Sequence, residues 1–230
     1  MIYVRSPVQG LLVRKMNRFL AQVTVDGRRH DAHIPNSGRL TELMKPDHKI
    51  ILEKADNPER KTRFTLKSVR YKGRWVCIDS TFPNALAYKL ALDGRLPGLS
   101  GYTGVRREHS IGRHRFDLLL DGPGQKPGIV EVKSVTLVVD GVAMFPDAPT
   151  VRGTSHLNAL SAMDGDDYAR MVLFIIQRSD GKLFRPNRGT DPEFADALRK
   201  ADDAGVLIRA LRCSVGERSQ KVLGPVEVEL

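Results

Sequence analysis

The pattern of apolar residues changes near Pro83, and this change constrains the fold more than any other feature of the chain. Before it, short stretches of alternating apolar and polar residues follow one another, as in an all-β domain. After it, stretches with helical spacing alternate with strand-like stretches, as in a mixed α/β domain. A chain of 230 residues is long enough for two domains. We therefore expect one domain over residues 1–82 and a second over residues 83–230.

The first 82 residues predict a small β-barrel. Phe19, Ala21, Val23 and Val25 occupy alternate positions, which is typical of a strand with one buried face. The Asp-Gly pair that follows is a strong hairpin signal. The full prediction is strands at residues 8–14, 18–25, 28–34, 48–53, 62–71 and 74–80, with a short helix at 39–44. This is the order of an OB-like barrel, a fold that commonly binds oligonucleotides, although an SH3-like barrel or a small sandwich has a similar pattern.

From residue 83 onward the sequence predicts a mixed sheet with helices on its faces. Asn84 is a suitable N-cap for a helix ending near Asp93. The later elements are strands at residues 102–111, 113–120 and 128–139, a helix at 154–163, a strand at 171–176, a helix at 191–204 and a strand at 206–213. The strand at 171–176 is continuously apolar, so both of its faces should be covered. We therefore expect an α/β domain built on a mixed sheet.

The charge of the chain is uneven. Its 37 lysines and arginines exceed its 27 acidic residues by ten, yet nine of these ten extra charges lie in residues 1–83. Such an asymmetry favours a dedicated surface for a polyanion, with solubility as the simpler explanation of a smaller excess. The nucleic-acid-binding residues that we expect are Arg18, Arg39, Lys61, Arg63, Lys67 and Arg74.

Several classes of protein are excluded by what the sequence lacks. Its longest apolar stretches, such as residues 172–176, are too short to span a membrane, and no apolar leader follows Met1, so we expect no membrane partner and a cytoplasmic location. Cys77 and Cys213 are too few for a disulfide framework and are expected to be buried thiols. The sequence contains no phosphate-binding glycine motif and no nucleophile elbow, so we expect no nucleotide cofactor.

Two acidic residues and a lysine occupy neighbouring strands of the predicted meander. Glu131 and Lys133 are two residues apart and therefore share one face of their strand, and a hairpin could bring Asp117 beside them. Asp117 and Glu131 could hold Mg²⁺ or Mn²⁺, while Lys133 could stabilise an attacked phosphate or orient a water nucleophile. These three residues are our candidate catalytic set. The alternative is a Glu131–Lys133 salt bridge on an exposed strand face.

The sequence also resembles the sugar fermentation stimulation protein A family. The resemblance runs in order from near residue 10 to near residue 215. Its residues are Ala32-His33-Ile34-Pro35-Asn36-Ser37-Gly38-Arg39-Leu40, Arg60-Lys61-Thr62, Pro83-Asn84, Arg115-Phe116-Asp117, Glu131-Val132-Lys133-Ser134-Val135-Thr136-Leu137, Phe145-Pro146-Asp147-Ala148-Pro149-Thr150, Arg152-Gly153, His156-Leu157 and Gln177-Arg178.

This resemblance implies an N-terminal OB-like domain and a second domain similar to the restriction-endonuclease-like PD-(D/E)xK nucleases. It also implies DNA binding with little sequence preference and a link to the regulation of sugar genes, chiefly maltose genes. The acid, acid and lysine of the nuclease motif then correspond to Asp117, Glu131 and Lys133. Related nucleases carry a further glutamate on the helix before the meander. Here that helix offers Lys89 and Asp93, and Glu108 on the first meander strand is either a substitute or an exposed strand residue.

Other residues have two interpretations each. His33 and His156 either approach phosphate or metal, or are structural, and Asp147 either lies near the cleft or only accepts backbone hydrogen bonds in a turn. Phe64, Tyr71 and Trp75 could stack on bases. A helix-turn-helix is not expected, because residues 206–211 read as a strand. Three functions stay open: DNA binding without cleavage, a Mg²⁺-dependent DNA nuclease, and an RNA-binding or RNA-processing module. The sequence does not fix the oligomeric state.

Overall fold

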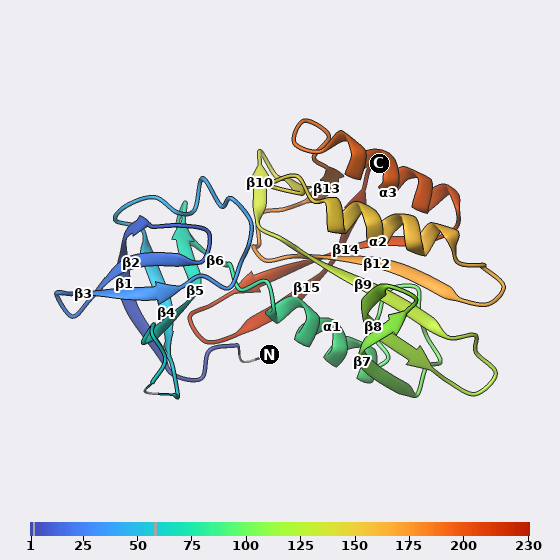
Figure 1. Ribbon diagram of the computed structural model, residues 1–230, viewed down its shortest axis with the longest axis horizontal. Coiled ribbons are helices and arrows are strands. Elements are labelled where there is room, and N and C mark those ends of the chain that lie inside the picture. Colours follow the sequence, from blue (N-terminus) through green and yellow to red (C-terminus); the bar gives the residue numbers. More distant parts are fainter. Residues whose placement is uncertain (2, 58) are drawn as a thin grey trace.

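A computed structural model describes residues 1, 3–57 and 59–230. Its elements form two separate sheets, with the first six strands at one end of the molecule and all three helices at the other (Figure 1). The first sheet contains β1 (Pro7–Lys15), β2 (Leu20–Val25), β3 (Arg28–His33), β4 (Lys49–Lys54), β5 (Phe64–Tyr71) and β6 (Arg74–Cys77). All six predicted strands of this region are therefore present.

The first sheet closes on itself as an OB barrel. Its strand order is β3-β2-β1-β4-β5-β6, and a parallel pairing of β3 with β5, which matches Ala32 with Phe64, joins the two sides. The interior is apolar and includes Leu12, Ile50 and Leu66. The OB-like prediction is confirmed.

The short helix predicted at residues 39–44 is wrong. The segment forms a single turn, in which the backbone N–H groups of Leu43 and Met44 both donate to the carbonyl oxygen of Leu40. Leu40 has a φ of +51°, which lies outside the right-handed helical region, so residues 39–44 do not form one continuous helix.

The second domain contains a nine-stranded mixed sheet. Its elements are α1 (Phe82–Leu92), β7 (Gly104–Ile111), β8 (His114–Asp121), β9 (Gly128–Val135), β10 (Leu137–Val139), β11 (Val142–Phe145), α2 (Val151–Ala162), β12 (Ala169–Ile176), β13 (Leu183–Pro186), α3 (Pro192–Asp203), β14 (Leu207–Val215) and β15 (Gln220–Val228). The strand order is β10-β11-β13-β15-β14-β12-β9-β8-β7. Strands β9, β12 and β14 are parallel, whereas β7–β8–β9 is an antiparallel meander. The predicted α/β mixed sheet is confirmed.

Helices cover both faces of this sheet. Helices α2 and α3 lie side by side on one face, and α1 lies on the other (Figure 1). Strand β12 accordingly sends Val172 and Phe174 into the α2–α3 core and Leu173 and Ile175 into the α1 core. A strand with both faces covered needs apolar residues at every position, which explains its continuous apolar run.

The barrel and the second domain share apolar packing. Tyr3, Val4, Ile51 and Cys77 from the N-terminal part belong to the same buried cluster as the α1 side of the large sheet. The backbone N–H of Cys77 donates to the carbonyl oxygen of Gln177 at 3.2 Å. Strand β6 ends at Cys77 and α1 begins at Phe82, so the boundary predicted between residues 82 and 83 lies in the first turn of α1.

Some predictions for the second domain need correction. Asn84 lies inside α1 rather than at its N-cap, which is Thr81. The strand predicted at residues 128–139 ends at Val135, and β10 then begins a separate hairpin with β11. Residues 206–211 do lie in or beside strand β14, as expected, so no recognition helix follows α3.

Both cysteines are buried and unpaired. Within the described part of the chain, no helix has the length and apolarity needed to cross a membrane.

Candidate functional site

Glu131 and Lys133 form a buried ion pair on β9. The Lys133 ammonium lies 2.5 Å from Glu131 Oε1, and the two side chains are only 12% and 5% exposed. Both side chains lie on one face of the strand, as its period of two requires. The alternative of an exposed surface salt bridge is therefore wrong. Because burying ions costs several kcal/mol unless they are compensated, this pair is an unusual use of a core strand.

Asp117 reaches the same place from β8. The β8–β9 ladder ends at the pair Leu118–Val130, and beyond it Asp117 Oδ2 accepts the backbone N–H of Val132 at 2.7 Å. The carboxylate thus replaces the next ladder bond where the two strands separate. Its other oxygen accepts a hydrogen bond from the Asn84 side chain, on α1, at 2.5 Å. The meander and the predicted trio of Asp117, Glu131 and Lys133 are brought together as expected.

His156 on α2 completes the buried cluster. Its Nδ1 lies 2.7 Å from Glu131 Oε1, and since a carboxylate only accepts, the ring donates this bond. The imidazole is buried and packs against Phe116 and His114, with ring centroids 5.4 Å and 5.6 Å away. Both interpretations of His156 fit this geometry, because the ring contacts a candidate metal-binding carboxylate and is also a buried packing residue that does not line the cleft around the site. His33 is half-buried on β3 and does not line that cleft either.

The two carboxyl groups differ in their affinity for a proton. Burial, followed by the negative charge of Glu131, raises the pKa of Asp117 to about 6. Burial also opposes ionisation of Glu131, but the Lys133 ammonium and the His156 ring outweigh it and lower the pKa of that group. Paired carboxyls with divergent pKa values are typical of functional sites. A divalent cation between them would favour the ionised form of both.

The two carboxylates are suited to a divalent cation. Glu131 Oε2 is buried and has no hydrogen-bond partner, so one lone-pair-bearing oxygen of an ionised group is left without compensation. Mg²⁺ commonly uses one or two protein carboxylates and takes its remaining ligands from water and phosphate. The described residues contain no group of three or more histidine, cysteine or acidic side chains placed to hold a metal. A site here would therefore rest on Asp117 and Glu131 and stay open to a phosphate ligand.

None of the three residues considered as a replacement for the additional nuclease glutamate reaches this site. Lys89 and Asp93 pair with each other at 3.1 Å on the surface of α1. Glu108 is exposed and lies 3.7 Å from Arg115. The residue of α1 that does reach the site is Asn84, which was assigned to helix capping. An amide can supply a neutral oxygen but no negative charge.

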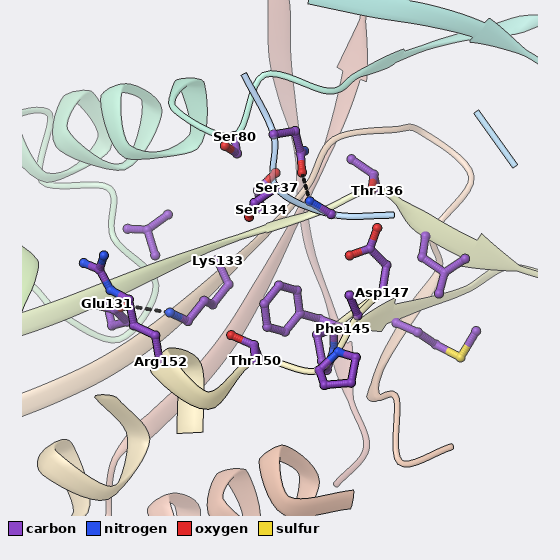
Figure 2. A pocket seen from close by; sticks show the side chains of 18 of the residues that line it. Ser37, Ser80, Glu131, Lys133, Ser134, Thr136, Phe145, Asp147, Thr150 and Arg152 are labelled. Atoms are coloured by element: carbon purple, nitrogen blue, oxygen red, sulfur yellow. Dashed lines mark hydrogen bonds and ion pairs between the residues drawn. The ribbon is translucent and has the colours of Figure 1, made fainter. Parts of the chain in front are cut away.

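A cleft of about 400 Å³ gives access to the cluster. Figure 2 shows Lys133 extending to Glu131 within it, together with Ser37 from the barrel and Asp147 from the loop between β11 and α2. Its residues come from both domains and are Arg18, Asn36, Ser37, Gly38, Ser80, Asn84, Asp117, Glu131, Val132, Lys133, Ser134, Thr136, Leu137, Met144, Phe145, Pro146, Asp147, Ala148, Pro149, Thr150 and Arg152. The site is thus at a domain interface, where ligand sites are common.

Asp147 connects the two domains at the edge of the cleft. Its Oδ2 accepts the backbone N–H of Leu40 in the barrel at 3.0 Å. Gly38 lies so close that a Cβ there would stand 2.6 Å from the same oxygen. Both interpretations of Asp147 therefore hold, because it lines the cleft and also accepts a backbone hydrogen bond. The bond is not within its own turn but to the other domain.

The expected nucleic-acid-binding residues are dispersed. Arg18 is exposed and lines the cleft, where its Nε donates to the carbonyl oxygen of Ser37 at 2.9 Å. Arg39, Lys61 and Arg63 are exposed but outside the cleft lining. Arg74 pairs with Asp180 of the second domain at 3.1 Å.

The structure corrects the expectation that Lys67 is an exposed nucleic-acid-binding residue. It does lie opposite the apolar face of β5, but it is not an exposed cation. Its ammonium lies 2.6 Å from Asp79 and 3.2 Å from Glu53, and its side chain is 13% exposed. Lys67 and both of its partners lie outside the cleft lining, so these ion pairs are structural and we remove Lys67 from the candidate DNA-binding set. No local sequence signal predicts these contacts, because the partners are 12 and 14 residues away.

The comparisons with known proteins bear on the whole chain. The family model described as the sugar fermentation stimulation protein RE domain matches residues 81–219, and that of the SfsA N-terminal OB domain matches residues 13–78. The chain belongs to the sugar fermentation stimulation protein family. A homolog from Methanobrevibacter smithii is 42% identical over 216 residues, which cover 90% of each chain. One from Desulforamulus reducens is 39% identical over 223 residues, or 97% of this chain and 92% of the relative.

A solved structure of the family has the same fold. Pyrococcus furiosus SfsA in complex with Ca²⁺ is 31% identical in sequence and superimposes with a TM-score of 0.91, covering 100% of this chain and 98% of that one. The resemblance found in the sequence motifs is therefore confirmed. Both domains of the family are present in their expected order.

Proposed function

We propose that this member of the sugar fermentation stimulation protein family binds DNA with little sequence preference in the cleft between its two domains. The observation that carries the proposal is the placement of exposed arginines from both domains, Arg18 and Arg152, around one cleft that also contains Lys133. Arginine and lysine at the edge of a cleft are suited to backbone phosphates. An adjoining recess, which shares Arg152 with the cleft, adds Arg113 and Arg115 from the β7–β8 hairpin.

The low sequence preference is part of the proposal. Phosphate contacts fix the position of a protein on DNA without reading bases, and sequence-specific proteins usually add a helix or ribbon in a groove. The segment after α3 is strand β14, so the chain has no recognition helix there. A role in regulating sugar genes, chiefly maltose genes, also belongs to this proposal and rests on family resemblance alone.

The binding site is tested by reversing one charge at a time. In fluorescence anisotropy with a labelled duplex and EDTA, Arg152→Glu should weaken binding roughly tenfold or more, because a favourable phosphate contact becomes a repulsive one. Arg95→Glu, an exposed arginine after α1 outside the cleft, makes the same charge change and should have a small effect. Equal losses in both variants would contradict binding in the cleft. Competition with RNA of the same sequence tests the RNA-binding alternative.

A second candidate function is divalent-metal-dependent cleavage of a phosphodiester. The specific observation in its favour is the unpartnered Glu131 Oε2 beside Asp117 and Lys133. When bound there, Mg²⁺ or Mn²⁺ would neutralise charge on the attacked phosphate and lower the pKa of a bound water. His156 holds Glu131 in place, and Lys133 is positioned to donate a hydrogen bond toward a phosphate oxygen in the cleft.

Cleavage is tested with supercoiled and single-stranded DNA. The wild type should convert supercoiled plasmid to nicked or linear DNA with Mg²⁺ or Mn²⁺ and not with EDTA, while Asp117→Ala and Lys133→Ala should lose at least 100-fold in rate (about 3 kcal/mol). Asp117→Ala, which removes no positive charge from the cleft, should still bind DNA in EDTA. Nicking that survives in both variants would mean that another site or a contaminant cuts. No nicking by the wild type would leave DNA binding as the function.

A further inference from the structure

Phe19 is exposed where an aromatic side chain would be expected to pack. Its side chain is 49% exposed, and it is the one aromatic residue among the large apolar side chains that are exposed in the described part of the chain. It has the same strand parity as Ala21 and Val23, which are fully buried in the barrel, but it precedes the first residue of β2. Phe19 therefore lies at the rim of the barrel instead of in its core.

The backbone around Phe19 is well fixed. Its N–H donates to Asn17 Oδ1 at 2.9 Å, and its carbonyl oxygen accepts the N–H of Ile34 at 2.8 Å. The turn before it is closed by Met16 N–H, which donates to the carbonyl oxygen of Leu20 at 2.8 Å. The exposed ring is thus presented by a hydrogen-bonded turn. Pre-organisation of this kind reduces the entropy lost on binding.

Arg18 connects this ring to the cleft. Its guanidinium carbon lies 5.8 Å from the centroid of the Phe19 ring, within the range of a cation–π contact. The same guanidinium donates to the carbonyl oxygen of Ser37, and Arg18 and Ser37 both line the cleft. A nucleic-acid strand whose phosphate contacts Arg18 would therefore have a neighbouring base within reach of the ring.

The aromatic residues proposed from the sequence for stacking are less available. Phe64 is 8% exposed in the barrel core. Trp75 is half-buried and packs partly against the shared core. Tyr71 is half-buried as well and packs partly against the barrel core. Phe19 offers a more accessible ring face, and it is beside the cleft.

We propose that Phe19 is a base-stacking residue that gives the protein a preference for nucleic-acid strands with unpaired bases. This inference rests on the proposed DNA binding and names its substrate class, single-stranded or frayed DNA. An aromatic ring stacks on the face of any base, so it adds affinity without adding sequence preference. Bases inside a duplex stack on each other and offer no free face except at the ends. Phe19 therefore distinguishes single strands from duplexes, while the arginines contact phosphates in both.

The test compares three ligands and three variants in EDTA. The ligands are a labelled single-stranded oligonucleotide, a covalently closed circular duplex without ends or loops, and a single strand in which the bases are replaced by abasic sites. Phe19→Ala should weaken single-strand binding roughly tenfold and leave duplex and abasic binding nearly unchanged. Phe19→Trp should retain single-strand binding. Leu223→Ala removes a similarly exposed apolar side chain on β15 and should change none of the three.

The outcomes separate this inference from the proposed function. If the wild type binds none of the three ligands, DNA binding itself fails. If it binds them, but Phe19→Ala loses the same factor on the abasic strand as on the normal one, the base is not what Phe19 contacts and the stacking inference is overturned. Unchanged single-strand binding by Phe19→Ala overturns it as well. Quenching of a 2-aminopurine base by wild type and Phe19→Trp, but not by Phe19→Ala, would be the direct sign of stacking.

Discussion

Lys67 and Lys133 are both buried and paired with carboxylates, but only Lys133 and its partner line the cleft. Their side chains are 13% and 12% exposed, and each ammonium lies within 2.6 Å of a carboxylate oxygen. The carboxylates around Lys67 belong to the barrel and to the start of α1, where Asp79 also accepts bonds from the backbone and hydroxyl of Thr81. The partner of Lys133 lines an open cleft. Burial and pairing alone therefore do not distinguish a structural lysine from a functional one.

Removing Lys67 should destabilise the fold. Lys67→Ala leaves Asp79 and Glu53 without their cation, and breaking a buried ion pair from one side costs about 3 kcal/mol. Urea denaturation measures this loss, with Arg63→Ala, an exposed cation immediately before β5, as a control that should change the free energy of unfolding by less than about 0.5 kcal/mol. A Lys67→Ala protein as stable as the control would contradict the structural role.

The ionised Asp117 carboxylate should lower the free energy of unfolding at neutral pH. Its raised pKa, about 6, means that the folded chain holds this proton more tightly than the unfolded chain. The free energy of unfolding therefore falls as the pH rises from about 4 to about 6, and the full penalty is present at pH 7. Asp117→Asn should raise stability by about 1–3 kcal/mol at pH 7 in EDTA and give no gain near pH 4.

Thermal unfolding of the two proteins across this pH range checks the prediction. EDTA is needed because a bound cation would favour the ionised carboxylate and offset the penalty. Adding Mg²⁺ or Mn²⁺ should then raise the melting temperature of the wild type and not that of Asp117→Asn. If Asp117→Asn were less stable than the wild type at pH 7 in EDTA, the ionised carboxylate would be stabilising and the assignment of its environment would be wrong.

At the scale of elements, the loop between β3 and β4 is held by one charged side chain from each domain, Asp147 of the second domain and Lys15 on β1 of the barrel. Asp147 accepts the Leu40 N–H, and the Lys15 ammonium donates to the carbonyl oxygens of Gly38 and Arg39 at 3.1 Å and 2.9 Å. Ser37 of this loop forms part of the cleft lining. The loop therefore sets one side of the cleft.

Gly38→Ala should disturb this loop. The new Cβ would lie 2.6 Å and 2.7 Å from the two carboxylate oxygens of Asp147, which is closer than any normal contact. We expect a loss of about 1–3 kcal/mol in stability and faster hydrogen exchange at the Leu40 amide. Gly104→Ala, whose Cβ would make only ordinary contacts, is the control. An unchanged Leu40 amide in Gly38→Ala would show that the loop does not depend on Asp147.

The elements that sequence patterns predicted are those that bury a regular face. Strand β12 and the strands of the barrel have such a face, whereas β11, β13 and β15 were missed. β15 contains Gly224 and Pro225, which argue against a strand, and its pairing with β14 shifts register by one residue of β15, because Arg212 pairs with Gly224 and Cys213 with Val222. That compensation depends on pairing with another strand and has no local signal.

The residues of the candidate site were likewise predictable only where regular strand pairing places them together. Asp117, Glu131 and Lys133 could be predicted because two adjacent strands of a meander place them together. Asn84 and His156 come from helices on opposite faces of the sheet, and only tertiary packing brings Asn84 to Asp117 and His156 to Glu131. The motifs that contain them signalled a resemblance to a family and did not specify their contacts.

At the scale of the whole molecule, the two domains are one folding unit. They share a buried apolar cluster, and a backbone hydrogen bond joins Cys77 to Gln177. We therefore expect a single calorimetric transition with equal calorimetric and van't Hoff enthalpies. Two resolved transitions would mean that the shared cluster contributes little to cooperativity.

The uneven charge of the chain also bears on how the two domains form the cleft. The excess of nine lies on the N-terminal part, but the cleft is completed by Arg152 and Lys133 from the nearly neutral second domain. In the proposed function, affinity for DNA is a property of the assembled interface, because phosphates bind between the domains.

The most direct test of this claim is the salt dependence of DNA affinity for the wild type and for the Arg18→Gln/Arg152→Gln double variant. Binding to phosphates predicts that log K falls linearly with log salt for the wild type, and that removing two phosphate contacts lowers the slope by up to about two. A wild-type affinity that does not change with salt, or a slope that is identical in the double variant, would contradict DNA binding at this cleft.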